Sequence, residues 1–487
     1  MSVKSFLFFK YAQWKVRKEL KTHARAGFYQ NKFLIPWLRE NKNTAFGIEH
    51  NFENIKDIST YWSRIPIRNY EDFLPYIEKI KQGNSQVLTK KDPQYFSLTS
   101  GTIAGSKYIP ISKAGIQHQI EAAVKVLCFY SVNSGHADFM NYKMIFLQGS
   151  PALDYSFKIP SGRLSGIVYH HIPKFFQRNK LPSYEVNIIE DWQTKLTKIV
   201  EETYREDISI LGGIPPWCLQ YFEKLLDISK TKNLKQLYPH LTMYMHGGLD
   251  FSNYKASMMR VLGADIPCMQ IFPASEGFFA LQDRMAAEDM LLLLNQGVYY
   301  EFRLYPNEGN TTITLEDVIV NTHYELIITN NSGLYRYAIG DLIEFTSIRP
   351  YRIKVVGRTR QFISAFGEHV IAYEIESAMA AASKSLNIEV NDYYVYPDVN
   401  RKQYVWLVEF HSELSKAILA ALTHQLDKNL ASLNKYYAHL LYGKIISSCR
   451  IISVCRGFFN LEREKAGKLG GQNKVVHLGM KKIYAHN

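Results

Sequence analysis

Apolar residues recur at helical spacing along the first part of the chain. The spacing from Phe6 to Trp37 predicts helical structure, and 57–61 and 70–80 are predicted to form two further helices separated by Pro66. The N-terminal stretch mixes basic and apolar residues, but it has no continuous apolar core and no small-residue cleavage site. It therefore predicts an amphipathic helix rather than an export signal.

From Tyr95 onward, short apolar strands alternate with helices. Strands are predicted at 95–98, 107–111, 143–147, 242–245 and 269–272, and helices at 113–130, 191–204 and 217–229. This alternation is typical of a mostly parallel α/β sheet.

The pattern changes again after Met290. Segments 298–302, 311–315, 325–329 and 342–348 are β-rich and broken by Asn, Gly and Asp, which predicts antiparallel hairpins or a small barrel. Beyond Arg349, helices at 372–384 and 414–433 and strands at 392–396 and 405–410 predict a compact α+β unit. We expect an α/β fold with a large N-terminal domain over 1–356, including a β-rich subdomain, and a small, mobile C-terminal domain over 357–487.

The composition is that of a globular protein, with 46% hydrophobic and 21% charged residues. The longest apolar runs fall far short of the roughly 20 residues that span a bilayer, so we expect no membrane insertion. The five cysteines are odd in number and form no CxxC pair, which predicts reduced thiols in a cytoplasmic protein.

Basic residues exceed acidic ones by 58 to 45, a net charge of +13. Such an excess favours anionic partners, including nucleotides, acyl carboxylates, nucleic acid and membrane surfaces. Because the charge is spread along the chain, we expect a solvated basic surface and no nucleic-acid partner.

The loop after Leu98 carries the first candidate chemistry. The segment SLTSGTIAGSK, 97–107, offers hydroxyls, unencumbered backbone amides and Lys107, so it can cradle phosphates. It is neither a Walker A motif nor GxGxxG, because Gly101 and Gly105 lie four residues apart. A surface turn without a ligand is the alternative.

Glu276 lies in PASEG, directly after the apolar strand MQIF. A carboxylate at the carboxyl end of a strand in an α/β sheet lies where ligands bind, and its oxygen suits Mg²⁺ bridging phosphates. The alternative is a loop or N-cap carboxylate.

The segment GLYRYAIGDLIEF carries the third candidate site. Gly340 permits a turn, Asp341 can accept hydrogen bonds from a ribose diol, and Arg336 can bind a phosphate. The alternative is a hairpin with a turn aspartate.

Taken in order, TSGT (99–102), ASEG (274–277), YRYAIGD (335–341) and VVGRTRQFISAFGEHV (355–370) resemble the motifs of the adenylate-forming superfamily. More closely, the chain resembles the Gretchen Hagen acyl-acid amido synthetases, the plant auxin-responsive and jasmonate-conjugating enzymes, in their bacterial-type members. That resemblance extends to GGIPPWCLQYFEKLL (212–226), YMHGGLDFSNYK (244–255), NQGVYYEF (295–302) and GGQNKVVHL (470–478).

The resemblance implies roles for individual residues. Nucleotide binding is implied for Thr99, Ser100, Gly101, Thr102, Phe272, Ser275, Asp341 and Arg358, with Asp341 on the ribose and Phe272 stacked on adenine. Glu276 matches the Mg²⁺-associated glutamate, and Lys474 matches the mobile catalytic lysine. Arg360 takes the hinge position. His246, Gly247 and Gly248 fall where the family lines the junction of the nucleotide and acyl pockets.

The chain departs from the family pattern in three segments. Ile103 replaces a hydroxyl residue of the phosphate loop, and Phe272 replaces a frequent Tyr, which keeps stacking but loses the hydroxyl. Val475, Val476 and His477 follow Lys474 where relatives tend to have Val, Pro and Arg, so the working lysine is either Lys474 or Lys468.

The resemblance therefore implies a ligase that uses ATP and Mg²⁺ to convert a carboxylic acid to its acyl adenylate and then joins the acyl group to an amino acid or another amine. We expect a monomer with small-molecule partners. The alternatives are a ligase of the same chemistry that acylates coenzyme A or a carrier thiol, and a non-catalytic anion-binding protein on this fold.

Overall fold

The computed structural model of the protein describes residues 2–99, 107–248, 251, 254–263, 266–285, 287–305, 311–359, 362–363, 365–366, 370–465 and 476–479. The chain divides into two compact units. The first comprises Met1–Gly248, Met258–Ile339 and Ile343–Lys354, and the second comprises Leu249–Ser257, Gly340–Leu342 and Val355–Asn487.

An 11-stranded sheet, most of which belongs to the first unit, has the order β11-β12-β13-β14-β10-β9-β8-β7-β6-β3-β5. The pairings from β5 through β3, β6 and β7 to β8 are all parallel. Those from β8 through β9 and β10 to β14 are antiparallel, as is the pairing of β11 with β12. The strands are β3 (Lys143–Phe146), β5 (Lys180–Leu181), β6 (Ile208–Gly212), β7 (Met243–Gly247), β8 (Cys268–Ala274), β9 (Gly277–Leu281), β10 (Met290–Leu292), β11 (Val298–Leu304), β12 (His323–Asn330), β13 (Tyr337–Ile348) and β14 (Tyr351–Arg358).

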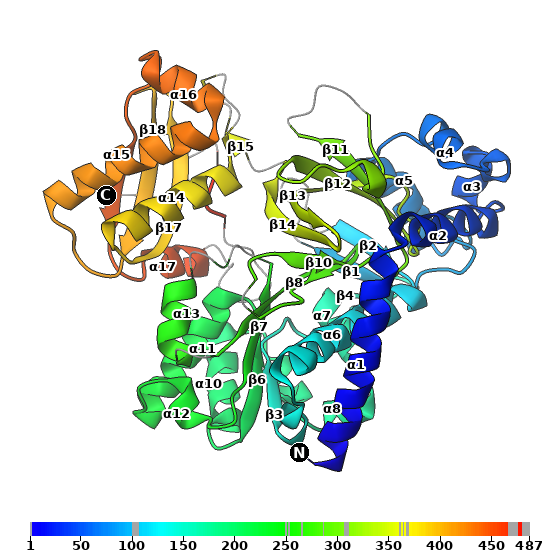
Figure 1. Ribbon diagram of the computed structural model, residues 1–487, viewed down its shortest axis with the longest axis horizontal. Helices are drawn as coiled ribbons and strands as arrows, with labels where there is room; N and C mark the ends of the chain where they lie inside the picture. The colour runs from blue at the N-terminus through cyan, green and yellow to red at the C-terminus, as the bar shows by residue number, and fades with distance from the viewer. Residues whose placement is uncertain are drawn as a thin grey trace. The chain divides into compact units, whose positions relative to one another are not determined.

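Helix α6 (Lys113–Ser134) packs between this sheet and α1 (Val3–His23) (Figure 1). The Ser112 hydroxyl caps α6 by accepting from the Gly115 amide at 3.0 Å, and Gly135 ends it with a φ of +78°. Apolar residues of α6, including Ala122 and Val126, join Met269 and Leu281 of the sheet in one hydrophobic core.

The other helices of this part of the chain are α2 (Ala26–Glu40), α3 (Ala45–Glu49), α4 (Ile58–Arg64), α5 (Tyr70–Lys81), α7 (Leu164–Tyr169), α8 (Lys174–Gln177), α9 (Tyr184–Asn187), α10 (Trp192–Thr203), α11 (Pro215–Ser229), α12 (Leu234–Leu237) and α13 (Lys255–Leu262). Three 3₁₀ turns are η1 (Phe52–Asn54), η2 (Asp138–Asn141) and η3 (Leu315–Asp317). A small second sheet has the order β2-β1-β4, with β1 (Tyr95–Thr99), β2 (Lys107–Ile111) and β4 (Ser161–Gly162).

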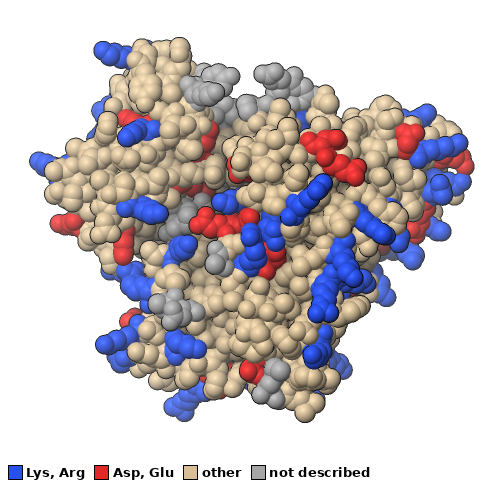
Figure 2. Space-filling view, in the orientation of Figure 1, with Lys and Arg blue, Asp and Glu red and all other residues tan. Residues whose placement is uncertain are grey.

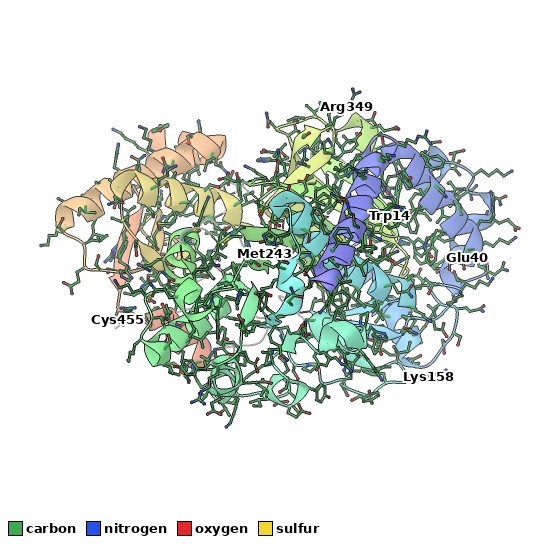
Figure 3. The ribbon with its side chains drawn as sticks, turned by 60° about the horizontal axis from the view of Figure 1, so that its bottom comes forward. Trp14, Glu40, Lys158, Met243, Arg349 and Cys455 are labelled. Carbon is green, nitrogen blue, oxygen red and sulfur yellow. The ribbon has the colours of Figure 1, made fainter. Side chains whose placement is uncertain are left out.

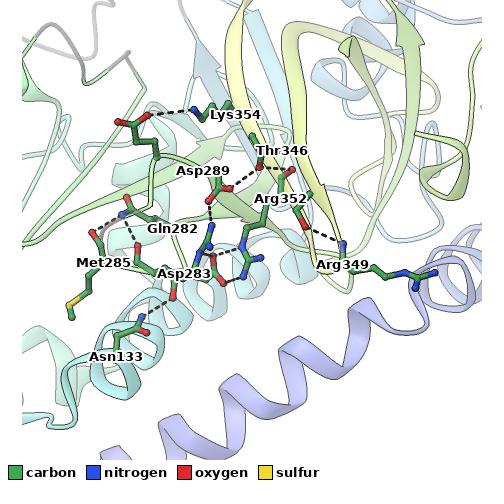
Figure 4. A network of polar contacts seen from close by, with 12 residues as sticks. Asn133, Gln282, Asp283, Met285, Asp289, Thr346, Arg349, Arg352 and Lys354 are labelled. Carbon is green, nitrogen blue, oxygen red and sulfur yellow. Dashed lines mark hydrogen bonds and ion pairs between the residues drawn. The ribbon is translucent and has the colours of Figure 1, made fainter. Parts of the chain in front are cut away.

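The pairing of β10 with β14 joins the two parts of the large sheet, because it links strands from distant parts of the chain. A polar network secures this joint (Figure 4). The Arg352 guanidinium donates two hydrogen bonds to the Asp283 carboxylate, at 3.0 and 2.6 Å. Asp289 in turn accepts from Arg284 and from the Thr346 hydroxyl, both at 2.7 Å.

The second unit is built on a sheet of β17 (Val390–Asp398), β18 (Gln403–Phe410) and β19 (Arg450–Val454). Helices α14 (Ala372–Leu386) and α15 (Lys416–Leu433) pack on each other and contribute to one core with the buried Trp406 of β18. Its remaining elements are β15 (Phe362–Ile363), β16 (Val370–Ile371), α16 (Lys435–Tyr442) and α17 (Phe458–Lys465).

The expected mixed α/β fold is confirmed, although the structure differs from the prediction in several local features. The helical stretch from Phe6 divides at residues 24–25 into α1 and α2. Strand β6, buried along its whole length, was not predicted. Segment 311–315, predicted as a strand, forms only a single antiparallel bridge, between Ile313 and Phe302, before the capping box of Thr314 and Asp317 begins η3. The β-rich strands continue the main sheet rather than closing a separate barrel.

Candidate functional site

Glu276 lies in the two-residue turn of a hairpin. Strand β8 ends at Ala274, β9 begins at Gly277, and Ser275 and Glu276 form the connection. Because β8 runs parallel to β7, this turn lies at the carboxyl edge of the parallel part of the sheet, where ligands bind in such folds. The expected position of Glu276 at the end of a strand is confirmed, although β9 was not expected.

Three hydrogen bonds from other elements fix this turn. The Ser275 and Ser97 hydroxyls lie 2.7 Å apart, which connects the turn to β1, and Thr99 lies two residues further along that strand. The side-chain amide of Gln119, on α6, donates to the Ala274 backbone carbonyl at 2.8 Å. The side-chain amide of Asn330, at the end of β12, donates to the Glu276 backbone carbonyl at 2.7 Å. Neither Gln119 nor Asn330 could be identified from the sequence, because neither lies in a motif and both are distant in sequence from the turn.

The end of β7 lies beside the end of β8. The register pairs His246 with Gln270 and Gly247 with Ile271, the residue before Phe272. A side chain at position 247 would meet the Ile271 carbonyl oxygen at 2.4 Å, and Gly248 has a φ of +85°, so both positions require glycine. The predicted junction residues and Phe272 therefore come together at one sheet edge.

His246 is buried, and its ring stacks on Tyr244 with centroids 5.5 Å apart. Burial lowers the pKa of His246 to about 3, so the imidazole is neutral at physiological pH. Phe272 packs edge-on against Phe279 with centroids 5.2 Å apart, which fixes one edge of its ring.

Asp341 and Arg358 meet in the second unit. Arg358 Nε lies 2.8 Å from an Asp341 carboxylate oxygen, and the Asp341 side chain is almost fully buried. Gly340, with a φ of +83°, turns its carbonyl to accept from the Thr359 amide at 2.8 Å. The two predicted nucleotide residues are thus brought together, and the ion pair orients the carboxylate.

The hypothesis that Arg336 binds a phosphate is wrong. Its guanidinium is buried and donates to Glu301, to Thr312 and to the backbone carbonyls of Trp62 and Ile65. Glu301 is itself fully buried, and burial raises its pKa despite the opposing effect of Arg336. These partners engage the guanidinium within the core of the first unit.

Five predicted residues lie outside the described part of the chain: Ser100, Gly101, Thr102, Arg360 and Lys474. The same holds for Ile103 and Lys468. The structure does describe His477, three residues beyond Lys474. The His477 ring is buried and stacks on Tyr393 with centroids 4.3 Å apart.

His477 is held between two carboxylates of its unit. Its Nδ1 lies 2.9 Å from Glu376 and its Nε2 lies 3.5 Å from Asp392, which also pairs with Arg463. Burial alone would lower the pKa of His477, but hydrogen bonds to Asp392 and Glu376 outweigh it and raise the pKa to about 9. His477 is therefore a cation at neutral pH.

The described residues of the site fit a metal ion that is held by a single carboxylate together with substrate phosphates. No group of three or more His, Cys, Asp or Glu side chains that could hold a metal occurs among the residues with a described placement. Mg²⁺, however, is commonly held by one or two carboxylates together with substrate phosphates. Glu276, in a turn anchored by Asn330, fits a single carboxylate ligand of that kind.

Known proteins resemble this chain along most of its length. The GH3 family N-terminal domain matches residues 17–197, the GH3 family central domain matches 291–358 and the GH3 family C-terminal domain matches 373–482, together more than half of the chain. A jasmonoyl–L-amino acid synthetase of Nicotiana attenuata is 24% identical over 83% of this chain and 82% of its own. An indole-3-acetic acid-amido synthetase of Arabidopsis thaliana is 21% identical over 73% and 78%.

Solved structures agree at the level of the fold. The GH3.15 acyl acid amido synthetase superimposes with a TM-score of 0.80 at 16% identity, covering 97% of this chain and 94% of that one. The three domain matches confirm the family expected from the motifs. With three consecutive domains matched in order, the chain belongs to the GH3 family.

Proposed function

We propose that this protein uses ATP and Mg²⁺ to activate a carboxylic acid as its acyl adenylate and then transfers the acyl group to the amine of an amino acid. Its relatives are named as amido synthetases, so the expected enzyme class, an amide-forming ligase, is confirmed. The observation that carries the detailed proposal is the convergence of His246–Gly248, Phe272 and the Ser275–Glu276 turn at the carboxyl edge of the parallel strands.

The residues described above fit distinct tasks in this reaction. Glu276 would hold Mg²⁺, whose charge, when the ion is bound, offsets that of the phosphates. Phe272 offers a face for adenine, and Asp341, oriented by Arg358, offers carboxylate oxygens to ribose hydroxyls. The neutral ring of His246 adds no positive charge beside the acid.

The proposed reaction has two steps. A carboxylate oxygen of the acid attacks the α-phosphorus of ATP, and the bond to pyrophosphate breaks. The nitrogen of the amine then attacks the acyl carbon, the bond to AMP breaks, and the amine loses its proton. Lys474 is proposed as the cation near the reacting carboxylate, with Lys468 as its competitor. We also propose a cytoplasmic monomer.

Acid-dependent exchange between ATP and pyrophosphate tests the first step. Glu276→Gln should lower exchange by about 10² to 10³, because it removes the carboxylate that would hold Mg²⁺ and so weakens the charge that offsets the phosphates in the transition state. Glu53→Gln is the matched control and should retain full exchange, because Glu53 is an exposed carboxylate that pairs with Lys42 at 2.7 Å. Normal exchange in Glu276→Gln would refute its metal role.

The identity of the acceptor distinguishes the proposal from its alternatives. Amide formation and AMP release supported by amino acids, but not by coenzyme A, would support the amido synthetase. Thioester formation with coenzyme A would favour the thiol ligase. ATP binding without exchange over a broad acid panel would favour a non-catalytic binding protein.

A further inference from the structure

Helix α1 presents an unusual face to solvent. At about 100° per residue, nine of its residues form one stripe centred on Trp14. We call this set the α1 outer stripe: Val3, Phe6, Leu7, Lys10, Tyr11, Trp14, Arg17, Lys18 and Lys21, all exposed. Val3, Leu7 and Trp14 expose 77%, 63% and 55% of their surface. Figure 3 labels Trp14 on this helix.

The opposite face of α1 holds the helix in place. Ser5, Ala12 and Val16 are buried there, and the buried Glu19 pairs with Lys125 of α6 at 2.7 Å. The largest apolar side chains of an ordinary surface helix face the core, whereas here several point outward. The outer stripe is thus not needed to attach α1 to the protein.

Basic and aromatic side chains are interleaved on the stripe. The Lys10 ammonium lies 5.5 Å from the Phe6 ring centroid, and the Lys18 ammonium lies 5.2 Å from that of Trp14. Glu19 is the only acidic residue among the first 30, and it faces inward. Figure 2 shows Lys and Arg side chains gathered along the part of the surface where Figure 1 places α1.

A further pair of a cation and an aromatic ring lies on the following helix. On α2, Phe28 is exposed, and the Lys32 ammonium lies 5.7 Å from its ring centroid. Aromatic rings and aliphatic side chains that reach into a bilayer interface, with cations among them, are typical of helices that lie in the plane of an anionic membrane.

We propose that the α1 outer stripe docks this protein peripherally on an anionic lipid surface. The stripe extends about 27 Å, from residue 3 to residue 21 at 1.5 Å per residue, enough for a helix lying in the plane of the surface. A second copy is a poorer partner, because the same stripe on that copy holds four cations and no carboxylate to pair with them. The apolar half at Val3, Phe6 and Leu7 suits lipid better than a phosphate backbone.

Docking of this kind is distinct from spanning the bilayer. No helix among the described residues has the length and apolar character needed to cross a membrane. Each basic residue near an anionic surface strengthens binding by roughly fivefold, so the contact should be reversible and sensitive to salt.

Sedimentation of the full-length protein with lipid vesicles tests the proposal. The protein should sediment with vesicles of phosphatidylcholine that contain about one third phosphatidylglycerol, and much less of it should sediment with pure phosphatidylcholine. Salt at about 0.5 M should return the bound protein to the supernatant. Arg17→Ser with Lys18→Ser should weaken binding by roughly 25-fold, since two cations are lost. Leu7→Ser with Trp14→Ser should weaken it through loss of apolar contact.

A matched pair elsewhere provides the control. Tyr442→Ser with Lys428→Ser removes an exposed aromatic and an exposed cation from the second unit and should leave vesicle binding unchanged. All variants should retain acid-dependent exchange, which separates this proposal from the proposed function. Equal retention on neutral and anionic vesicles, or unchanged binding of both stripe variants, would overturn it. So would dimerisation or nucleic-acid binding through the stripe without vesicle binding.

Discussion

The guanidinium of Arg336 illustrates how a single residue in a promising motif can serve the core instead. It lies five residues before Asp341, yet its hydrogen bonds reach Glu301, Thr312 and the backbone around Trp62. The motif identified the segment, but the direction of the Arg336 side chain depends on the buried carboxylate of Glu301, which is 35 residues away in sequence. Such long-range partners leave no local signal.

Replacing Arg336 should therefore affect stability first. Arg336→Met would leave Glu301 buried without its cation, at a cost of about 3–5 kcal/mol in the free energy of unfolding. Urea unfolding measures this loss, and Glu301→Gln combined with Arg336→Met should recover part of it. Unchanged stability together with a raised KM for ATP would restore the phosphate-binding hypothesis.

The candidate site residues also divide into those with a local signal and those without one. Glu276 and Asp341 were predicted from short motifs, because each lies in or beside a turn. Gln119 and Asn330 were not found, because each acts on a backbone carbonyl brought close only by folding. The requirement for glycine at positions 247 and 248 likewise becomes evident only from the backbone geometry.

Among the secondary-structure elements, helices with a clear cap were predicted closely. Ser112 and Asp191 each accept from a backbone amide three residues on, and α6 and α10 begin where these residues indicate. The strands were harder, because the five buried residues of β6 carry no alternation of polar and apolar positions. The pairing of β10 with β14 was not predictable from either segment alone.

The joint between β10 and β14 offers a test at this scale. Asp283→Ala would leave the Arg352 guanidinium, which is mostly buried, without its carboxylate, and should lower the free energy of unfolding by about 3 kcal/mol. Lys354 lies on the same strand as Arg352 and pairs with the exposed Glu288 at 3.6 Å, so Lys354→Ala should change the free energy of unfolding by less than about 0.5 kcal/mol. Similar losses in the two variants, measured by chemical denaturation, would show that the network does not secure the joint.

For the whole molecule, the sequence established the family and the mixed α/β class, since motifs in a fixed order extend over nearly the full length. It did not reveal that parallel and antiparallel strands share one sheet, nor that α1 faces solvent with its aromatic residues. Both depend on packing between segments that are remote in sequence.

The stability of the whole molecule should depend on alkaline pH through His477. Its pKa is raised in the folded state, so the stabilisation is complete below about pH 6.5, the usual value for His, and is lost as the pH rises through about 9. A shift of this size corresponds to about 3 kcal/mol. The temperature at the midpoint of thermal unfolding should therefore decrease as the pH is raised from 7 to 9.5.

His477→Gln is the control for this dependence. The substitution removes the titrating ring but keeps a side chain able to form hydrogen bonds with Glu376. The variant should be less stable at pH 7, and its unfolding midpoint should depend less on pH over the same range. An equally steep decline in the variant would assign the pH dependence to other groups.

The late position of β14 has a consequence for synthesis on the ribosome. Strands β3 and β6 to β10 can assemble once about 290 residues have emerged, but the free edge of β10 finds its partner only after residue 353. Until then a nascent chain carries an unpaired strand edge that neighbouring chains can join. Truncations that end before β14 should accumulate as aggregates, whereas the complete sheet removes that edge.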